Sequence, residues 1–219
     1  EEKAQSHYEN GLQLFEEENY VKAGLEFRNA LQLNGNLADA WYHLALVEEQ
    51  DGKLREYAGD LYKTIELDSQ HVPAHVRIAK ILLFSGRLEE AVQKSELVMR
   101  LAPESADVWS LRGAVLFRQK KNDEAIKAAQ KALEIEPGHV EASLVIAVEA
   151  ITRNEPDLAL KVLDTSLKVH SENVPLQLAK MQALQKKGDK AGIETVFREL
   201  IKSNPEEANF RNNLTRFYL

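Results

Sequence analysis

Two histidines, His71 and His75, stand four residues apart, the spacing at which one helix can present both imidazoles to a single metal ion. Pro73 lies between them and predicts a turn, so we expect the two rings on either side of a helix boundary. No carboxylate stands beside the pair to complete a set of ligands. The pattern therefore predicts two boundary histidines and no metal site.

The other residues that could do chemistry are similarly isolated. Glu16, Glu17 and Glu18 form an acidic run at a predicted bend between helices, where we expect solvated side chains and no calcium site. The chain contains no cysteine, which excludes disulfides, thiolate catalysis and cysteine-based zinc sites. It also lacks a phosphate-cradling glycine loop and a nucleophile–base pair. These features predict a protein that is not an enzyme and that uses no cofactor.

The elements that carry these residues repeat along the chain every 34 residues. Pairs of mostly small residues, seven apart, recur without insertion at 23/30, 57/64, 91/98, 125/132, 159/166 and 193/200. A fixed period near 34 is typical of a helical repeat array. If each unit is counted from nineteen residues before its pair, the units start at Ala4, Ala38, Val72, Ala106, Val140 and Val174. Positions within a unit are numbered below as places, with the unit start as place one.

Each unit has the pattern of two helices joined by a tight turn. Within residues 38–51, apolar residues follow the spacing of three and four that marks one face of a helix. Gly52 follows, and Gly86 and Gly188 recur at the same place in two other units. Glycine adopts the left-handed conformation that ends one helix before the next begins. The repeated unit is therefore predicted to be a helix-turn-helix.

Several spaced positions of the unit resemble the tetratricopeptide repeat. Trp41 and Trp109 occupy place four, Gly11 and Gly113 occupy place eight, and Pro103 stands near the end of its unit. The stretches that match best are AWYHLALVEEQDGKLREYAGDLYKTIELDS and VWSLRGAVLFRQKKNDEAIKAAQKALEIEP. The resemblance implies an all-α, right-handed superhelical solenoid of helix-turn-helix repeats. Because it covers the chain from its first unit onward, we expect a single array over residues 1–219, with a terminal helix at 208–219.

Charge and hydropathy limit the classes of partner. The net charge is −7, with 20 acidic and 11 basic residues through Ser110 and 15 acidic and 17 basic residues after it. No basic stripe typical of nucleic-acid binding is present. No apolar run approaches the roughly 18 residues that a membrane-spanning helix needs, so we expect no direct membrane insertion. The chain begins at Glu1 without a signal-like segment, as a trimmed fragment would, which leaves the cytoplasm and a bacterial periplasm or envelope both open.

The resemblance also implies where a partner binds. In this family the second, fifth, ninth, twelfth and thirteenth places of the first helix tend to face an inner groove. The candidate groove residues are Tyr8, Leu12, Phe15, Tyr42, Leu46, Val76, Lys80, Leu83, Phe84, Phe117, Arg118, Leu144 and Val148. An exposed apolar strip of this kind is typical of a site for a peptide or an amphipathic helix. The alternative is that several of these residues pack between adjacent first helices.

We therefore expect a non-enzymatic scaffold or adaptor that binds a protein segment in the groove. One alternative is a structural assembly subunit that associates through the ends or the outer face of the solenoid. Another is a regulatory domain of a longer protein. The units also resemble bacterial repeat proteins of envelope, secretion or polysaccharide-export systems.

The C-terminal residues predict one further helix. Phe210, Leu214, Phe217 and Tyr218 share one face of it. Such a helix either caps the array or is the first helix of a seventh unit. An exposed end of this kind could support self-association.

Overall fold

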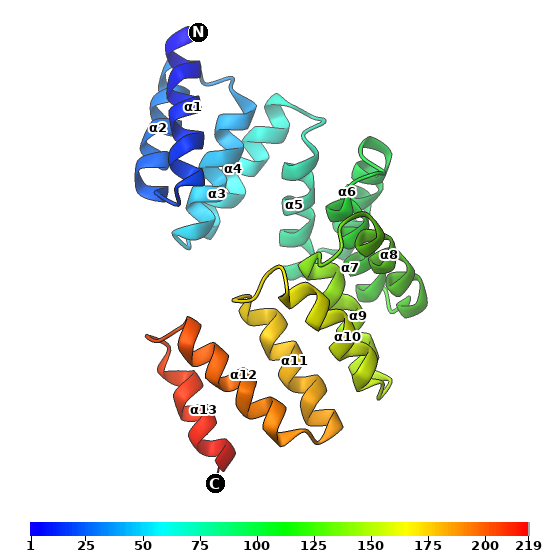
Figure 1. The fold of residues 1–219 in the computed structure, drawn as a ribbon. Coiled ribbons are helices and arrows are strands. Elements are labelled where there is room, and N and C mark those ends of the chain that lie inside the picture. Colours follow the sequence, from blue (N-terminus) through cyan, green and yellow to red (C-terminus); the bar gives the residue numbers. More distant parts are fainter. Residues whose placement is uncertain (219) are drawn as a thin grey trace. The chain divides into compact units, whose positions relative to one another are not determined.

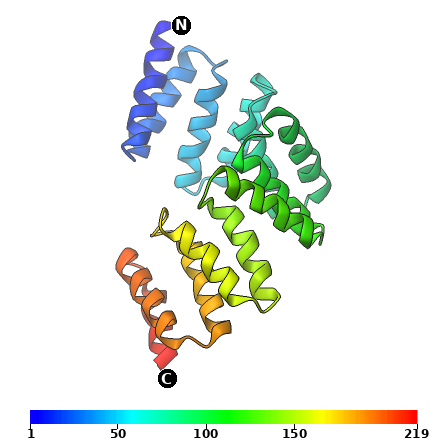
Figure 2. The same cartoon turned by 45° about the vertical axis from the view of Figure 1, so that its right-hand side comes forward.

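The computed structural model describes residues 1–218, which form thirteen α-helices and no strand. This confirms the all-α class, and the helices follow one another as hairpins (Figures 1 and 2). Their bounds are α1 (Glu2–Glu16), α2 (Tyr20–Leu33), α3 (Ala38–Gln50), α4 (Leu54–Leu67), α5 (Val72–Phe84), α6 (Leu88–Leu101), α7 (Ala106–Arg118), α8 (Asn122–Ile135), α9 (Val140–Thr152), α10 (Pro156–Leu167), α11 (Val174–Lys187), α12 (Lys190–Ser203) and α13 (Ala208–Tyr218).

The chain divides into two compact units, Glu1–Ala102 (unit 1) and Pro103–Leu219 (unit 2). Unit 1 contains α1 to α6, and unit 2 contains α7 to α13. The single array over residues 1–219 stays a prediction. Leu219, the last residue of the expected terminal helix, lies outside the described residues.

The predicted register agrees with the helix bounds. Five of the six predicted unit starts are the first residues of α3, α5, α7, α9 and α11. The exception is the first unit, in which α1 begins at Glu2, two residues before the predicted start at Ala4. Each second helix, from α2 to α12, also begins 34 residues after the one before it. The sequence period is therefore the structural period.

A residue with a left-handed backbone separates the two helices of every repeat. Gly52, Gly86 and Gly188 have φ angles of 70°, 77° and 75°, as predicted. The other three repeats use Glu18, Lys120 and Asn154, with φ angles of 58°, 61° and 61°. A side chain at positive φ carries a local cost, roughly 1–2 kcal/mol for ordinary residues. The turn geometry is thus kept in all six repeats even where glycine is absent.

The two helices of a repeat approach closely because small residues lie at their contact. Ala125 and Ala132 of α8 are fully buried. A Cβ added to Gly113 of α7 would lie only 3.2 Å from the backbone oxygen of Ala125. In α1, a Cβ at Gly11 would lie 2.5 Å from the Phe27 ring, which occupies the space that the glycine leaves. The hairpin contact therefore depends on small residues on at least one side.

In five helices the side chain at place four forms a hydrogen bond to the loop that precedes its helix. Trp41 and Trp109 donate their indole N–H to the carbonyl oxygens of Gly35 and Pro103, at 2.9 and 2.7 Å. The same donor-to-carbonyl bond, always six residues back, is made by other residue types in three further helices, through the pairs His75–Ser69 (2.9 Å), Gln177–Ser171 (2.6 Å) and Arg211–Pro205. In these five helices the fourth place thus supplies an N–H donor that can belong to an indole, an imidazole, an amide or a guanidinium group.

The terminal helix α13 packs onto the core of unit 2. Phe210, Leu214 and Phe217 lie against the cluster that includes Phe197 and Leu200 of α12. The polar residues on the opposite side of α13 are exposed, while Tyr218, expected on the packed face, is largely exposed as well. A polar outer face of this kind is what a solenoid end requires. Self-association through this helix stays a prediction.

Two carboxyl groups face each other between α3 and α4 of unit 1. Glu48 is buried, and its Oε2, like Oδ2 of Asp60, has no hydrogen-bond partner among the described residues. Arg28 approaches the other oxygen of Glu48 at 3.5 Å. Burial, followed by the nearby charge of Glu48, raises the pKa of Asp60 from its ordinary 3.8 to about 7. The pair therefore holds a proton near neutrality.

The close hairpin contact predicts that Ala125→Leu is destabilising. The longer side chain would have to fit where the helices already touch, so we expect the free energy of unfolding to fall by roughly 1–3 kcal/mol. Ala191→Leu, at an exposed position of α12, is the matched control and should change stability little. Urea titration followed by circular dichroism measures both. Equal stabilities of the two variants would contradict the packing argument.

The carboxyl pair predicts a pH dependence of stability. Between pH 3.8 and about 7 the folded protein keeps a proton on Asp60 that the unfolded chain has lost, so the unfolding free energy falls as pH rises through this window. Asp60→Asn should remove this component and raise stability at pH 8. Denaturation between pH 5 and 8 checks the prediction, with the exposed Asp51→Asn as control. An unchanged slope in the Asp60 variant would refute it.

Candidate partner-binding surface

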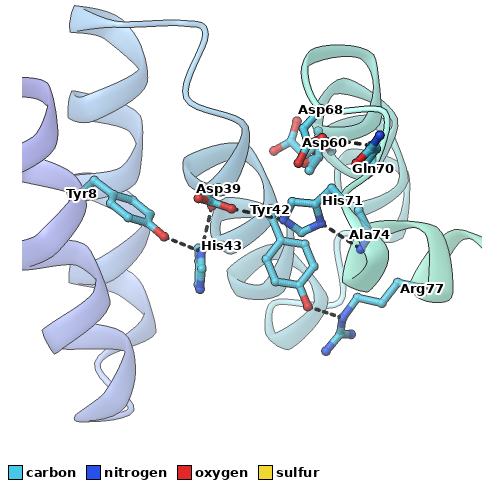
Figure 3. A network of polar contacts seen from close by, with 11 residues as sticks. Tyr8, Asp39, Tyr42, His43, Asp60, Asp68, Gln70, His71, Ala74 and Arg77 are labelled. Atoms are coloured by element: carbon cyan, nitrogen blue, oxygen red, sulfur yellow. Dashed lines mark hydrogen bonds and ion pairs between the residues drawn. The ribbon is translucent and has the colours of Figure 1, made fainter. Parts of the chain in front are cut away.

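The first helices of unit 1 are joined by a polar and aromatic network, shown in Figure 3. His43 of α3 lies at its centre, with ring contacts to Tyr8, Phe15, Phe27 and Tyr42 at centroid distances between 5.3 and 6.1 Å. These rings come from α1, α2 and α3. The network therefore links the first repeat to the second.

The hydrogen bonds of His43 fix its protonation state. Its Nδ1 lies 2.8 Å from the backbone carbonyl oxygen of Asp39, which can only accept, so Nδ1 carries the hydrogen. The Tyr8 hydroxyl, at 3.3 Å from the same nitrogen, then accepts as well. Burial lowers the pKa of His43 despite this hydrogen bond. Burial and the charge of Asp39 raise the pKa of Tyr8 to about 12. Both rings are therefore neutral at pH 7.

His71 joins α3 to α5 in the opposite tautomer. Its Nδ1 accepts the backbone N–H of Ala74 at 3.1 Å and caps α5, so the hydrogen must be on Nε2. That Nε2–H donates to the Asp39 carboxylate at 3.2 Å. The Tyr42 ring packs beside the imidazole, with centroids 4.7 Å apart. The histidine is thus both a helix cap and a link between repeats.

Unit 2 repeats this arrangement with His139. Its ring caps α9 through the N–H of Ala142 at 3.4 Å and pairs with Asp107 at 3.2 Å. Burial lowers the pKa of His139, but the hydrogen bond to Asp107 and the charges of Glu141, Asp107 and Glu136 outweigh burial and leave the pKa raised. Glu141 lies 3.6 Å from Nδ1, where the first copy of the arrangement has Pro73.

Arg77 completes the network on α5. It donates to the Tyr42 hydroxyl at 3.2 Å, to the Tyr57 hydroxyl at 3.4 Å and to the Glu49 carboxylate at 2.6 Å. Its pKa is raised, because the hydrogen bonds to the two tyrosines and the charge of Glu49 outweigh burial, the largest single influence. The guanidinium is thus held in place by three side chains.

The two histidines considered first do not combine into a metal site. Contrary to the expectation that they straddle a turn at Pro73, α5 begins at Val72 and Pro73 lies in its first turn, because proline is tolerated where helical N–H groups lack partners. His71 caps the helix, and His75 donates to Ser69. Among residues 1–218, no group of three or more His, Cys, Asp or Glu residues is arranged to hold a metal ion.

The groove candidates of unit 1 differ in what they can offer to a partner. Tyr8, Leu12 and Phe15 are partly exposed and pack on the core around Phe27. A second group is also partly exposed, namely Tyr42, Leu46 and Lys80. Val76 and Leu83 are buried and present little surface, while Phe84, at the end of α5, is 91% exposed. Packing between helices therefore accounts for part of the predicted strip.

The candidates of unit 2 show the same mixture. Phe117 and Leu144 are partly buried against the core clusters of α7 to α11. Val148 is 39% exposed, and Arg118 at the end of α7 is exposed. Within each unit the candidates lie on the first helices, as the repeat register predicts. Their role in binding stays a prediction.

Large exposed apolar residues are more frequent on the second helices than on the first. They include Val21, Leu25 and Leu33 of α2, Leu54 and Tyr62 of α4, Ile135 of α8 and Leu158 of α10. These residues are not among the groove candidates predicted from the sequence, and neither are His43, Arg77 or the two Asp–His pairs. A signal for the pairs is present in the sequence, because Asp39/His71 and Asp107/His139 share a separation of 32 residues at equivalent places.

These features define a protein built of helix-turn-helix repeats. A family model for the tetratricopeptide repeat matches residues 106–139. The helix pairs before and after this repeat begin at the same 34-residue spacing. A solved structure of a thermophilic tetratricopeptide-repeat protein from Thermus thermophilus superimposes with a TM-score of 0.67 at 21% identity, over 83% of this chain and 99% of that one. Residues 106–139 therefore form a tetratricopeptide repeat, and the chain has the fold of tetratricopeptide-repeat proteins.

Two further similarities extend over almost the whole chain. The solved PilF of Pseudomonas aeruginosa has a TM-score of 0.68 at 20% identity and covers 98% of both chains. The human protein O-mannosyl-transferase TMTC3 is 23% identical over 98% of this chain. The chain spans about a quarter (24%) of the length of that human relative. Within residues 1–218, none of the helices combines the length and the apolar character needed to cross a bilayer.

The network predicts that two histidines titrate in opposite directions. His43 should have a pKa below 6.5 and show the Nδ1–H tautomer, whereas His139 should have a pKa above 6.5. Nitrogen–proton correlation spectra recorded between pH 5 and 8 report both properties. Single His→Gln variants assign the signals. A reversed order of the two pKa values would contradict the network.

Proposed function

We propose that this chain is a non-enzymatic scaffold that binds a protein segment along its first helices. The single observation that carries the proposal is a row of side chains at place nine, formed by Leu12, Leu46 and Lys80 in unit 1. All three are partly exposed, and they come from consecutive first helices. In unit 2 the same place holds Ala114, Val148 and Gln182, of which Val148 is an exposed apolar residue. The fold of a family that binds protein partners supports this general role.

The network on the same first helices favours binding by a preorganised surface. His43 is held by hydrogen bonds and by four neighbouring rings, and Arg77 is held by Tyr42, Tyr57 and Glu49. Side chains that are already fixed lose less conformational freedom when a partner binds. A peptide or helix with an apolar stripe fits the aliphatic part of the row, and Lys80 favours an acidic residue at one end.

A structural assembly subunit and a regulatory domain of a longer protein are the alternative functions. The exposed apolar residues of α2 and α4 favour the assembly alternative, because such residues mark interaction surfaces when they cluster. The chain spans 24% of the length of TMTC3, which is compatible with a regulatory domain within a longer protein. The likeness to PilF, at 20% identity, is a likeness of fold and favours none of these functions over the others.

The experiment compares matched substitutions on the two kinds of helix. A photo-crosslinking residue at Leu46 identifies a partner in the cells of origin, and the purified partner is then titrated against variants. Leu46→Ala and Val148→Ala should weaken binding, by about 2 kcal/mol or ~30-fold in Kd at a central contact. Val21→Ala removes an equally apolar and more exposed side chain from α2 and should have no effect.

The opposite result separates the alternatives. If Val21→Ala weakens association while both first-helix variants bind normally, the scaffold proposal fails. Loss of self-association in the same variant, measured by analytical ultracentrifugation, would then identify an assembly subunit. Circular dichroism of each variant shows that the fold is retained.

A further inference from the structure

Unit 2 contains a pocket on the side of its second helices, away from the place-nine row. Its volume is ≈ 500 Å³, within the roughly 300–1,000 Å³ typical of ligand pockets. The helices α8 and α10 line its sides, α9 contributes Ile146, Glu149 and Ala150, and Arg153 follows directly after α9. Both α8 and α10 pack against α9. The pocket is therefore a trough between two second helices.

The repeat register explains why the trough is open. Place eleven is leucine in four units, at Leu14, Leu82, Leu116 and Leu184. In the fifth unit the same place is Ala150, which lines the pocket. Removing the outer atoms of a buried leucine leaves a space that the surroundings only partly fill. The fifth unit thus has a smaller side chain at this place than the four units with leucine or the second unit with Glu48, which widens the trough above Ala150.

The lining is apolar within and acidic at the edge. Apolar residues come from all three helices, namely Ile126, Leu133, Ile146, Ala150, Leu158 and Val162. Leu158 is 44% exposed at the edge of the trough. The charged lining residues are Glu134, Glu149 and Glu155 with one cation, Arg153.

The positive charge of Arg153 is already neutralised by two carboxylates. Arg153 bonds to Glu149 at 2.7 Å and to Asp123 at 2.7 Å. Asn122 bonds to the other Glu149 oxygen at 2.9 Å, so this buried carboxylate is fully occupied. Glu155 is exposed, and its carboxylate makes no ion pair among the described residues. Glu134 pairs only with exposed Lys131, a contact worth little in water. The edge therefore attracts positive charge.

We infer that this trough binds an amphipathic helix of a protein partner, which inserts leucine or an aromatic side chain above Ala150 and places lysine or arginine beside Glu155 and Glu134. The lining residues recur at the spacing of a helix turn on α8 (Ile126, Gln130, Glu134) and on α10 (Leu158, Val162). A trough bounded by two helices accepts the apolar face of a third. Charge complementarity selects a basic segment as the occupant.

The test uses the full chain and two synthetic peptides. Both are capped, alanine-based helices with leucine and tryptophan on one face, and they differ only in lysine or glutamate flanks. Binding is followed by the methyl signals of Ile126, Leu158 and Val162 in nuclear magnetic resonance spectra. We expect the lysine peptide to shift these signals and to bind about tenfold or more tightly than the glutamate peptide at low salt.

Three variants decide the outcome. Ala150→Leu introduces the leucine that four other units have at this place and should abolish binding, whereas the exposed Ala191→Leu should leave it unchanged. If Ala150→Leu fails to fold, Leu158→Ala at the exposed edge takes its place and should weaken binding. Undiminished binding by the folded trough variant, or equal affinity for the two peptides, would overturn the inference. Leu46→Ala should not affect this binding, which separates the trough from the place-nine row.

Discussion

The close approach of two helices within each repeat is the constraint on which the remaining structure depends. At Gly113 and Ala125 the backbones come so near that even one added methyl group would press against a carbonyl oxygen. At Gly11 the same space is filled by the ring of Phe27. A repeat thus tolerates either two small residues or a glycine opposite a large one. The helices from α2 onward keep starts 34 residues apart within the first-helix and second-helix series, so the unit length is constant along the chain.

The first helices depend on that contact for their position, and the polar network depends on the first helices. His43 and His71 are close in the same network yet require hydrogens on different ring nitrogens. Such an arrangement leaves little freedom for either ring, since rotation of one would break a helix cap or a carbonyl bond. The result is a set of fixed aromatic and charged side chains on the helices that carry the place-nine row.

The period predicted the helices and turns, because spacing reflects local geometry. Gly52 indicated its turn through its residue type, whereas Lys120 and Asn154 adopt the same backbone without that signal. Burial was harder to predict. Val76 and Leu46 occupy comparable groove places, but only Val76 is buried, because burial depends on the side chains of neighbouring helices. The protonated Asp60 likewise depends on a carboxylate from another helix.

The donor at place four has a consequence for how such chains are recognised. Five helices keep one hydrogen bond to the preceding loop, yet they use tryptophan, histidine, glutamine and arginine to make it. Natural selection can therefore exchange the residue while conserving the bond. The family model matches the repeat that contains Trp109. The other repeats of the chain differ from it in residue type more than in the positions of their helices. Repeat counts made from residue identity alone will undercount units of this kind.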